Sequence, residues 1–141
     1  TKPKGKENNK KITYDDCKDI IKKLRFNEES DLFAIERDNG LKSIIGNIYQ
    51  SFDGNDIYNS IEEKASNFLY MIVKDHVFVD GNKRIAATLF IYFLSFYEIL
   101  KIDNDQVIDN NTLTAITLLI AESSPKEKDI IIDLIMNFLI R

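Results

Sequence analysis

The sequence has little glycine, proline, cysteine or histidine, and it has no tryptophan. Five glycines and two prolines in 141 residues are too few for a turn-rich β-sandwich or a low-complexity chain. The single cysteine, Cys17, excludes an intrachain disulfide framework, and the single histidine, His76, excludes the usual zinc sites built from several Cys and His ligands. A formal net charge of −4 excludes a broadly basic surface, so no nucleic-acid partner is expected.

Hydrophobic residues make up 44% of the chain, which is enough for the core of one domain. Residues 1–11 are polar and rich in lysine, and they contain no apolar segment of the kind that a signal peptide needs. We therefore predict a flexible linker or tail over residues 1–11 and a single helical domain over residues 12–141. The polar start and the missing initiator Met indicate a fragment of a longer protein.

Apolar residues recur at spacings of three and four in several segments, and this periodicity predicts helices. Six are expected, at about residues 13–24, 29–37, 60–73, 82–100, 112–122 and 125–139. Ser60 with Glu63 and Ser124 with Glu127 are typical of capping boxes at helix starts. The fourth helix is apolar nearly all round. Charged residues interrupt it before it reaches the about 18 apolar residues of a membrane span, so we expect it at the centre of a bundle.

The region Leu41–Tyr58 has a different pattern. Apolar and polar residues alternate before the turn sequence Asp53-Gly54-Asn55, which is typical of a β-hairpin. The alternating residues are Ile48, Tyr49, Gln50, Ser51 and Phe52. An isolated hairpin is marginally stable, so we expect it to lie on the helical body as a flap. The predicted fold class is all-α, a bundle of about six helices with a small β-hairpin flap.

The segment between the third and fourth expected helices is typical of a phosphate site. Gly81 allows a close approach of the backbone, and Asn82, Lys83 and Arg84 begin a helix. A helix N-terminus presents unpaired N–H groups and a partial positive charge to an anion. Lys83 adds a point charge there and Arg84 adds a bidentate fork.

Three more residues of this segment suit the same ligand. Asp80 precedes Lys83 and Arg84 in the chain. A carboxylate in this position, beside bound phosphates, would hold Mg²⁺. His76 could accept the proton of an attacking hydroxyl, and Phe78 would turn inward and anchor the loop. Each residue alone also has a plainer explanation: a structural histidine, a helix cap at Asp80, and a solvated helix start. The combination within one nine-residue segment favours the chemical interpretation.

The segment resembles the conserved loop of the Fic/Doc family, whose pattern is H-x-F-x-[D/E]-[G/A]-N-x-R. The matching residues are His76, Phe78, Asp80, Gly81, Asn82 and Arg84. The resemblance covers about Thr13–Leu100, and it is closest to the C-terminal domain of bacterial RhuM-like virulence proteins. It implies a Fic/Doc-type helical bundle that transfers a phosphate-containing group from a nucleotide to a hydroxyl of a target protein.

The resemblance also implies a role for each residue of the loop. His76 would be the general base and Asp80 the Mg²⁺ ligand, while the backbone and side chains over 81–84 would bind the phosphates of ATP. The residues 48–52 would be the flap edge against which a target segment docks as an added strand. The family context implies a bacterial cytoplasmic protein, with delivery into a host cell left open.

The sequence departs from the AMP-transferring members at two positions. Lys83 stands where their loop has a second glycine, and Ala87 stands where they have a second arginine. The lysine is similar to the Doc branch, which binds the nucleotide in the reversed orientation and transfers the γ-phosphoryl group. The departures slightly favour phosphorylation. AMP transfer and a degenerate binding module without activity remain the alternatives.

The family's inhibitory helix carries the pattern [S/T]-x-x-x-E-[G/N]. Here only Ser123 and Glu127 have this spacing, but Lys128 follows, and Glu127 is already explained as a capping residue. We therefore predict no inhibitory helix in these residues, and any restraint is expected upstream or in a partner such as an antitoxin.

Overall fold

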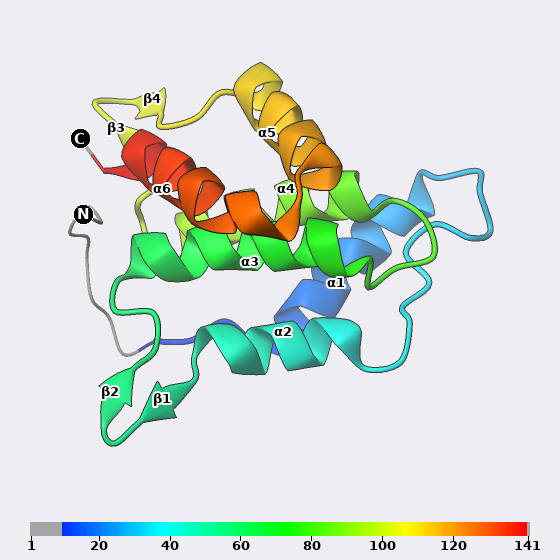
Figure 1. Cartoon of the computed structure of the whole chain (residues 1–141). Coiled ribbons are helices and arrows are strands. Elements are labelled where there is room, and N and C mark those ends of the chain that lie inside the picture. Colours follow the sequence, from blue (N-terminus) through cyan, green and yellow to red (C-terminus); the bar gives the residue numbers. More distant parts are fainter. Residues whose placement is uncertain (1–9, 141) are drawn as a thin grey trace.

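Helix α3 forms the centre of the fold, and all of its residues from Ile61 to Val73 are buried. The computed structural model describes residues 10–140, and within them six α-helices and two short hairpins are present. Around α3 (Ile61–Asp75) pack α2 (Gly40–Ile48), α4 (Asn82–Phe96), α5 (Asn110–Glu122) and α6 (Lys128–Leu139), as Figure 1 shows. Helix α1 (Tyr14–Phe26) packs against α2 and α4. The expected all-α class is confirmed.

Polar side chains begin the helices where the sequence predicts them. The hydroxyl oxygen of Ser60 accepts a hydrogen bond from the backbone N–H of Glu63 at 3.1 Å. The carboxylate of Glu63 accepts in turn from the N–H of Asn59 at 3.0 Å. The capping box of Ser124 and Glu127 is complete, and it opens a 3₁₀ turn (Pro125–Glu127) that leads into α6. Local capping chemistry therefore sets these boundaries.

Two of the expected elements are wrong. Residues 29–37 form turns and isolated bridges rather than a helix, and Ala34 has a positive φ of 64°. A helix that was not predicted, α2, instead occupies Gly40–Ile48, so Ile48 ends a helix and Tyr49 caps it. The expected strand over residues 48–52 is therefore only two residues long. Six helices are present as predicted, because the helix wrongly expected over residues 29–37 is offset by the unpredicted α2.

The hairpin at Asp53-Gly54 is confirmed and a second hairpin was missed. Strand β1 (Ser51–Phe52) pairs with β2 (Asn55–Asp56) around Asp53 and Gly54, which have φ values of 53° and 79°. Strand β3 (Lys101–Ile102) pairs with β4 (Asp105–Gln106) in a region expected to be a simple polar connection. The second turn uses Asp103 and Asn104, also at positive φ. It lacks glycine, so the turn signal in the sequence is weaker.

The central helix is also not the one expected. Helix α4 ends at Phe96 and leaves Lys83 and Arg84 exposed, so its burial is one-sided. Helix α3 takes the central position although it carries Glu62, Glu63 and Lys64. The ammonium of Lys64 donates to Asp56 at 2.9 Å and to a backbone carbonyl at 2.5 Å, which satisfies it inside the fold. Within residues 10–140, no helix combines the length and apolar character that crossing a membrane requires.

The start of the described chain is anchored to the bundle. Ile12 is buried, and its N–H donates to the hydroxyl of Tyr49 at 2.9 Å. The hydroxyl of Tyr97 donates to the carbonyl of Lys10 at 2.5 Å. Most of the tail predicted over residues 1–11 lies outside the described residues.

Candidate active site

His76 ends α3 and begins the loop that joins it to α4. It has φ 53° and ψ 50°, a left-handed conformation that stops the helix and turns the chain. Val77 and Phe78 then point into the core, at 5% and 1% exposure, whereas His76 and Asp80 are exposed. The buried pair holds the loop against the bundle, so that the histidine and the carboxylate remain accessible from solvent.

The side chain of Asn82 closes this loop. Its Oδ1 accepts from the N–H of Phe78 at 2.9 Å, and its Nδ2 donates to the carbonyl of Phe78 at 2.8 Å. Both polar groups of the amide are used on the loop itself, and the residue is only 7% exposed. Asn82 can therefore offer a ligand its backbone N–H, together with those of Lys83 and Arg84 in the first turn of α4.

Gly81 is required for the packing of the loop as well as for the approach of a ligand to its backbone. It caps α4 with a φ of 89°, a conformation that suits glycine. A Cβ at this position would overlap the ring of Phe33, which is buried against the loop. The sequence interpretation considered only the approach of a phosphate here, and it missed the aromatic neighbour.

A segment that follows α1, residues 27–39, lies alongside the loop. Its backbone pairs with the loop through three hydrogen bonds: Ala34 N–H to Asp80 at 3.0 Å, Val79 N–H to Ile35 at 2.8 Å, and Arg37 N–H to Val77 at 2.7 Å. Two isolated bridges, Phe33 with Asp80 and Glu36 with Phe78, accompany these bonds. The apolar pattern did not indicate this pairing, because Leu32, Phe33 and Ile35 also fit a helical period.

The hairpin expected as the flap does not reach the loop. It lies before the first turn of α3, and His76 follows the last turn, as Figure 1 shows at the two ends of this helix. The 15 residues of α3 span about 22 Å at 1.5 Å per residue. Of the five proposed flap residues, Ile48 is fully buried in α2, and Phe52 at the tip is 76% exposed. The structure brings residues 76–84 together and leaves residues 48–52 apart from them.

Three basic side chains surround the loop. Lys83 is exposed at the start of α4. The guanidinium of Arg84 forms an ion pair with Glu28 and lies over the ring of Phe33, at 5.5 Å from its centre. Lys74, in the last turn of α3, donates to the carbonyls of Ile120 and Ser123 at the end of α5. Lys74 was not singled out from the sequence, where it looks like an ordinary solvated residue.

Three hollows meet at these residues. A cavity of about 200 Å³ is lined by Lys74, His76, Asp80 and Lys83 among others. Lys83 also lines a groove of about 430 Å³ between α4 and α5. His76 also lines a hollow of about 420 Å³ beside residues 37–40. Lys83 and His76 thus connect the small central cavity to one larger space each.

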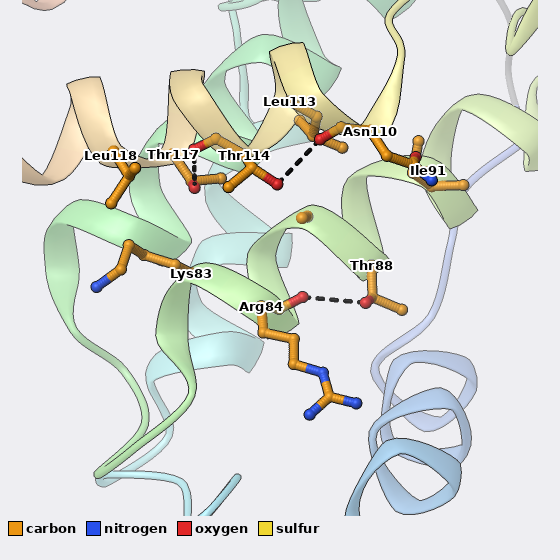
Figure 2. A pocket seen from close by; sticks show the side chains of 10 residues that line it. Lys83, Arg84, Thr88, Ile91, Asn110, Leu113, Thr114, Thr117 and Leu118 are labelled. Atoms are coloured by element: carbon orange, nitrogen blue, oxygen red, sulfur yellow. Dashed lines mark hydrogen bonds between the residues drawn. The ribbon is translucent and has the colours of Figure 1, made fainter.

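The groove between α4 and α5 combines apolar and hydroxyl groups. Figure 2 shows Thr88 on α4 and Thr114 and Thr117 on α5, each with its hydroxyl donating to a carbonyl of its own helix. Lys83 and Arg84 line the groove from the same helix as Thr88. Ala87, one helical turn after Lys83 on α4, also lines the groove with a small side chain. The other apolar lining residues are Ile91, Leu113 and Leu118. Such a lining suits a flat, partly polar group with a negative charge at one end.

Two side chains have a raised pKa, one beside the loop and one in the core. Partial burial raises the pKa of Asp75, next to His76, and the charge of Lys128 opposes this shift. Burial raises the pKa of the Cys17 thiol to about 12, and Asp16 adds to the effect. Cys17 is fully buried, so it belongs to the core and is not a reactive thiol.

Asp80 is the residue of the loop that fits a metal ion. Mg²⁺ is usually held by one or two carboxylates, by water and by the phosphates of a substrate. Asp80 is exposed, and it lines the same cavity as Lys83 and the N-terminus of α4, so a phosphate-bound Mg²⁺ would meet its carboxylate. Within residues 10–140 no group of three or more His, Cys, Asp or Glu side chains could share a metal.

The loop places His76 and Asp80 beside the N-terminus of α4, where Lys83 and Arg84 add positive charge. Such a site belongs to a class of helical proteins suited to binding phosphate groups. The sequence model of the Fic/DOC family matches residues 11–94, which is more than half of the chain. The chain therefore belongs to the Fic/DOC family. No curated protein and no solved structure matches it significantly.

The residues that the family model matches include the loop and the paired segment 27–39, and they end before α5. The closer likeness to RhuM-like proteins stays a prediction.

Proposed function

We propose that the protein transfers the γ-phosphoryl group of ATP to a Ser, Thr or Tyr hydroxyl of a target protein. The observation that carries this proposal is the groove between α4 and α5, which begins at Lys83 and passes Ala87. Family membership supports nucleotide-dependent transfer in general. The groove supports one orientation of the nucleotide over the other.

The orientation follows from the space on each side of the loop. The transferred phosphate would lie in the central cavity, beside His76 and the first N–H groups of α4. The rest of the nucleotide would extend past Lys83 into the groove, where Ala87 leaves room and Thr88 and Thr114 offer hydroxyls. The γ-phosphate is then the one nearest His76. In AMP transfer the α-phosphate would have to lie there instead.

The target would approach from the opposite side. The hollow beside residues 37–40 also contains His76, so a hydroxyl that enters there meets the histidine before it meets the phosphate. We therefore expect the target to dock on the segment 27–39, whose residues 37–39 line this hollow, and not on the hairpin that the sequence predicted as the flap. Ile35 of this segment and Val79 of the loop are each 37% exposed and offer apolar contacts to a target.

The reaction needs one proton acceptor and a set of N–H donors and cationic side chains that bind the phosphate oxygens. His76 accepts the proton of the target hydroxyl as its oxygen bonds to the γ-phosphorus, and the bond from that phosphorus to the bridging oxygen of ADP breaks. The N–H groups over 81–84 and the side chains of Lys83 and Arg84 stabilise the charge on the phosphate oxygens. Mg²⁺ held through Asp80 would neutralise charge on the leaving ADP. Most of the rate enhancement would come from positioning and electrostatics.

Two alternative functions are less well supported by the residues of the loop. Transfer of AMP is the activity that the family resemblance associates with two arginines in this loop, and here Ala87 replaces the second of them. A binding module without activity would have no need of the exposed His76 and Asp80 beside a helix N-terminus.

Label transfer decides between these functions. The protein is incubated with Mg²⁺, cell lysate and ATP that is labelled at either the γ- or the α-phosphate. We expect protein-bound label from γ alone, and no label with His76→Ala, which should still bind MgATP nearly as tightly in calorimetry. Label from α would establish AMP transfer instead. A folded protein that binds MgATP but gives no label from either position would contradict both reactions, and one that binds no nucleotide would favour the binding module.

A further inference from the structure

A fourth hollow, of about 460 Å³, lies between α1 and the segment 27–39, and the proposed reaction makes no use of it. We call it the α1 groove. Ile21 of α1, Ala34 of the segment and Phe78 of the loop line it, and they are 8%, 8% and 1% exposed. These buried side chains give the groove an apolar base that can receive an apolar group from a partner.

The loop and the segment 27–39 separate this groove from the hollow that contains His76. On the loop, Phe78 lines the groove, and its neighbour Val77 lines the hollow. On the segment, Glu36 lines the groove, and its neighbour Arg37 lines the hollow. Successive side chains of extended backbone point to opposite faces, which explains this division. The groove therefore lies directly behind the entrance for the target hydroxyl, with the two paired backbones between them.

Three cationic side chains of α1 border the groove. Lys18, Lys22 and Arg25 follow one another at spacings of four and three, which places them on one face of the helix. Lys18 lies over the ring of Tyr14, at 5.6 Å from its centre. Within residues 10–140, none of the three cations forms an ion pair with a carboxylate. Their charges are therefore available to an incoming anionic group.

Two carboxylates also line the groove, those of Asp19 and Glu36. The hydroxyl of Tyr14 donates to Glu36 and lies 3.0 Å from each of its carboxylate oxygens. Asp19 is exposed on α1. The three cations outnumber these two carboxylates, although the whole chain has a formal net charge of −4. The groove is therefore a locally positive surface with an apolar base on an acidic protein.

We propose that the α1 groove docks an acidic segment of the target protein, in which an apolar side chain lies between carboxylates. The inference rests on the proposed function, because the target is the protein whose hydroxyl enters beside His76. The apolar side chain would cover Ile21 and Phe78, and the carboxylates would pair with the cations of α1. This segment is separate from the acceptor hydroxyl, so its docking raises the local concentration of the hydroxyl at His76.

Docking can be measured without any transfer, by the fluorescence anisotropy of a labelled peptide made of Glu-Glu-Leu-Glu repeats. Lys22→Glu reverses a charge in the groove, and Lys23→Glu reverses the next charge along α1, which is exposed and lies outside the groove lining. An exposed ion pair changes an equilibrium by about two- to fivefold, and a reversed charge adds a repulsion of similar size. We therefore expect Lys22→Glu to weaken peptide binding by about three- to tenfold.

The other variants test whether the groove itself binds the peptide. At about 0.15 M salt the reach of an exposed charge is about 8 Å, so Lys23→Glu should stay within about twofold of the wild type. Asp19→Asn removes a carboxylate from the groove and should tighten binding by about twofold. Urea transitions verify that each variant is folded. Equal weakening by the two lysine variants, or weaker binding by Asp19→Asn, would overturn the proposal.

Two control peptides test the chemistry of the docked segment. Repeats of Glu-Glu-Ser-Glu keep the charge but lack the apolar side chain, so they should bind at least about fivefold more weakly. Repeats of Lys-Lys-Leu-Lys keep the leucine and reverse the charge, and they should not bind measurably. If the serine peptide binds as tightly as the leucine peptide, the surface attracts any polyanion and the inference fails. Tight binding of the lysine peptide would contradict the role of the cations.

Label transfer separates this inference from the proposed function. With γ-labelled ATP and limiting amounts of lysate, Lys22→Glu should label its target about three- to tenfold more slowly than the wild type and Lys23→Glu. Its affinity for MgATP should be unchanged. If the wild type and Lys22→Glu label the target at equal rates, the docking role fails and the proposed function stands. If the peptides bind as expected but no protein is labelled, the proposed function fails, and the variants still establish a docking site for acidic segments.

Discussion

At the scale of single residues, the loop depends on side chains that bond to its own backbone. Asn82 pairs with both polar groups of Phe78, and Gly81 leaves space for Phe33. Both residues belong to the family pattern that the sequence matched. Their structural contacts show that each would be required at its position even before a ligand binds.

Asn82 gives a test of this structural role. Asn82→Ala leaves the buried N–H and carbonyl of Phe78 without their partner. Each such group costs about 1–3 kcal/mol, so we expect a loss of about 2–6 kcal/mol in the free energy of unfolding. Asn82→Asp keeps the acceptor but places a carboxylate oxygen against the Phe78 carbonyl, so at pH 7 it should be no more stable than the alanine variant. Below the pKa of the new carboxyl, its proton can donate to that carbonyl and stability should partly return. Urea unfolding at pH 7 and pH 4 measures this. An Asn82→Asp variant as stable as the wild type at pH 7 would contradict the role of the Nδ2 bond.

At the scale of elements, local chemistry predicted starts and turns better than it predicted long-range pairing. The caps at Thr13, Ser60 and Ser124 and the turn at Asp53-Gly54 agree with the structure because each depends on neighbours within about four residues. Residues 29–37 were mistaken for a helix because their apolar spacing is ambiguous. Their conformation is set by pairing with residues 40 or more positions later in the chain.

The same distinction applies to the candidate site. The loop 76–84 was found because its residues are contiguous, and the helix N-terminus that it starts is a local feature. Glu28, Phe33 and Lys74 were missed because their relation to the loop exists only after folding. The hairpin was assigned to the site from its alternation, but the length of α3 separates the two. The alternation of residue types in the hairpin does not reveal that the whole length of α3 lies between the hairpin and the loop.

The N-cap of α5 gives a prediction about pH. The carboxylate of Asp109 accepts from the N–H of Thr112 at 2.7 Å, and this bond lowers the pKa of Asp109 below its ordinary value of 3.8. A lowered pKa in the folded state means that the contribution to stability is present above about pH 4 and is lost as the pH falls through the folded value. We expect Asp109→Ala to be less stable at pH 7. Asp109→Asn, which keeps a capping oxygen, should stay close to the wild type at pH 7 and lose less stability between pH 4 and pH 2. Urea unfolding across this range checks it, and a steeper acid loss for Asp109→Asn would contradict the cap assignment.

A second prediction at this scale compares the hairpin with the paired segment. Phe52 is 76% exposed on the hairpin, and Ile35 is 37% exposed beside the loop. If the target docks on the segment, Ile35→Ser should lower kcat/KM for the target by about tenfold, which corresponds to the loss of one partly buried aliphatic contact. Phe52→Ser should leave kcat/KM within about twofold of the wild type on the same reasoning. MgATP affinity should be unchanged in both variants. The reverse pattern, with Phe52 important and Ile35 neutral, would restore the hairpin as the flap.

At the scale of the whole molecule, α3 separates the two ends of the fold. Both hairpins lie at the end of the bundle where α3 begins, and the loop with the segment 27–39 lies at the other end, as Figure 1 shows. Three hollows open around that second end, and each is connected to the next through a shared residue. This arrangement gives a nucleotide one direction in which to extend from the loop and a target another.

The groove between α4 and α5 allows the two nucleotide orientations to be distinguished by a single substitution. Ala87 lines the groove next to Lys83 and Arg84. If the nucleoside occupies this groove, Ala87→Arg fills its space, and we expect MgATP binding to weaken by at least about tenfold, the effect of losing roughly 1.4 kcal/mol of contact. Transfer of γ-label should fall in parallel. If the groove instead receives the terminal phosphates, as AMP transfer requires, the new guanidinium would pair with them, so binding should tighten and α-label should rise. Ala87→Ser, which is polar but small, is the control and should bind MgATP like the wild type. The two orientations predict opposite signs for the change in affinity, so calorimetry on these two variants is enough to choose between them.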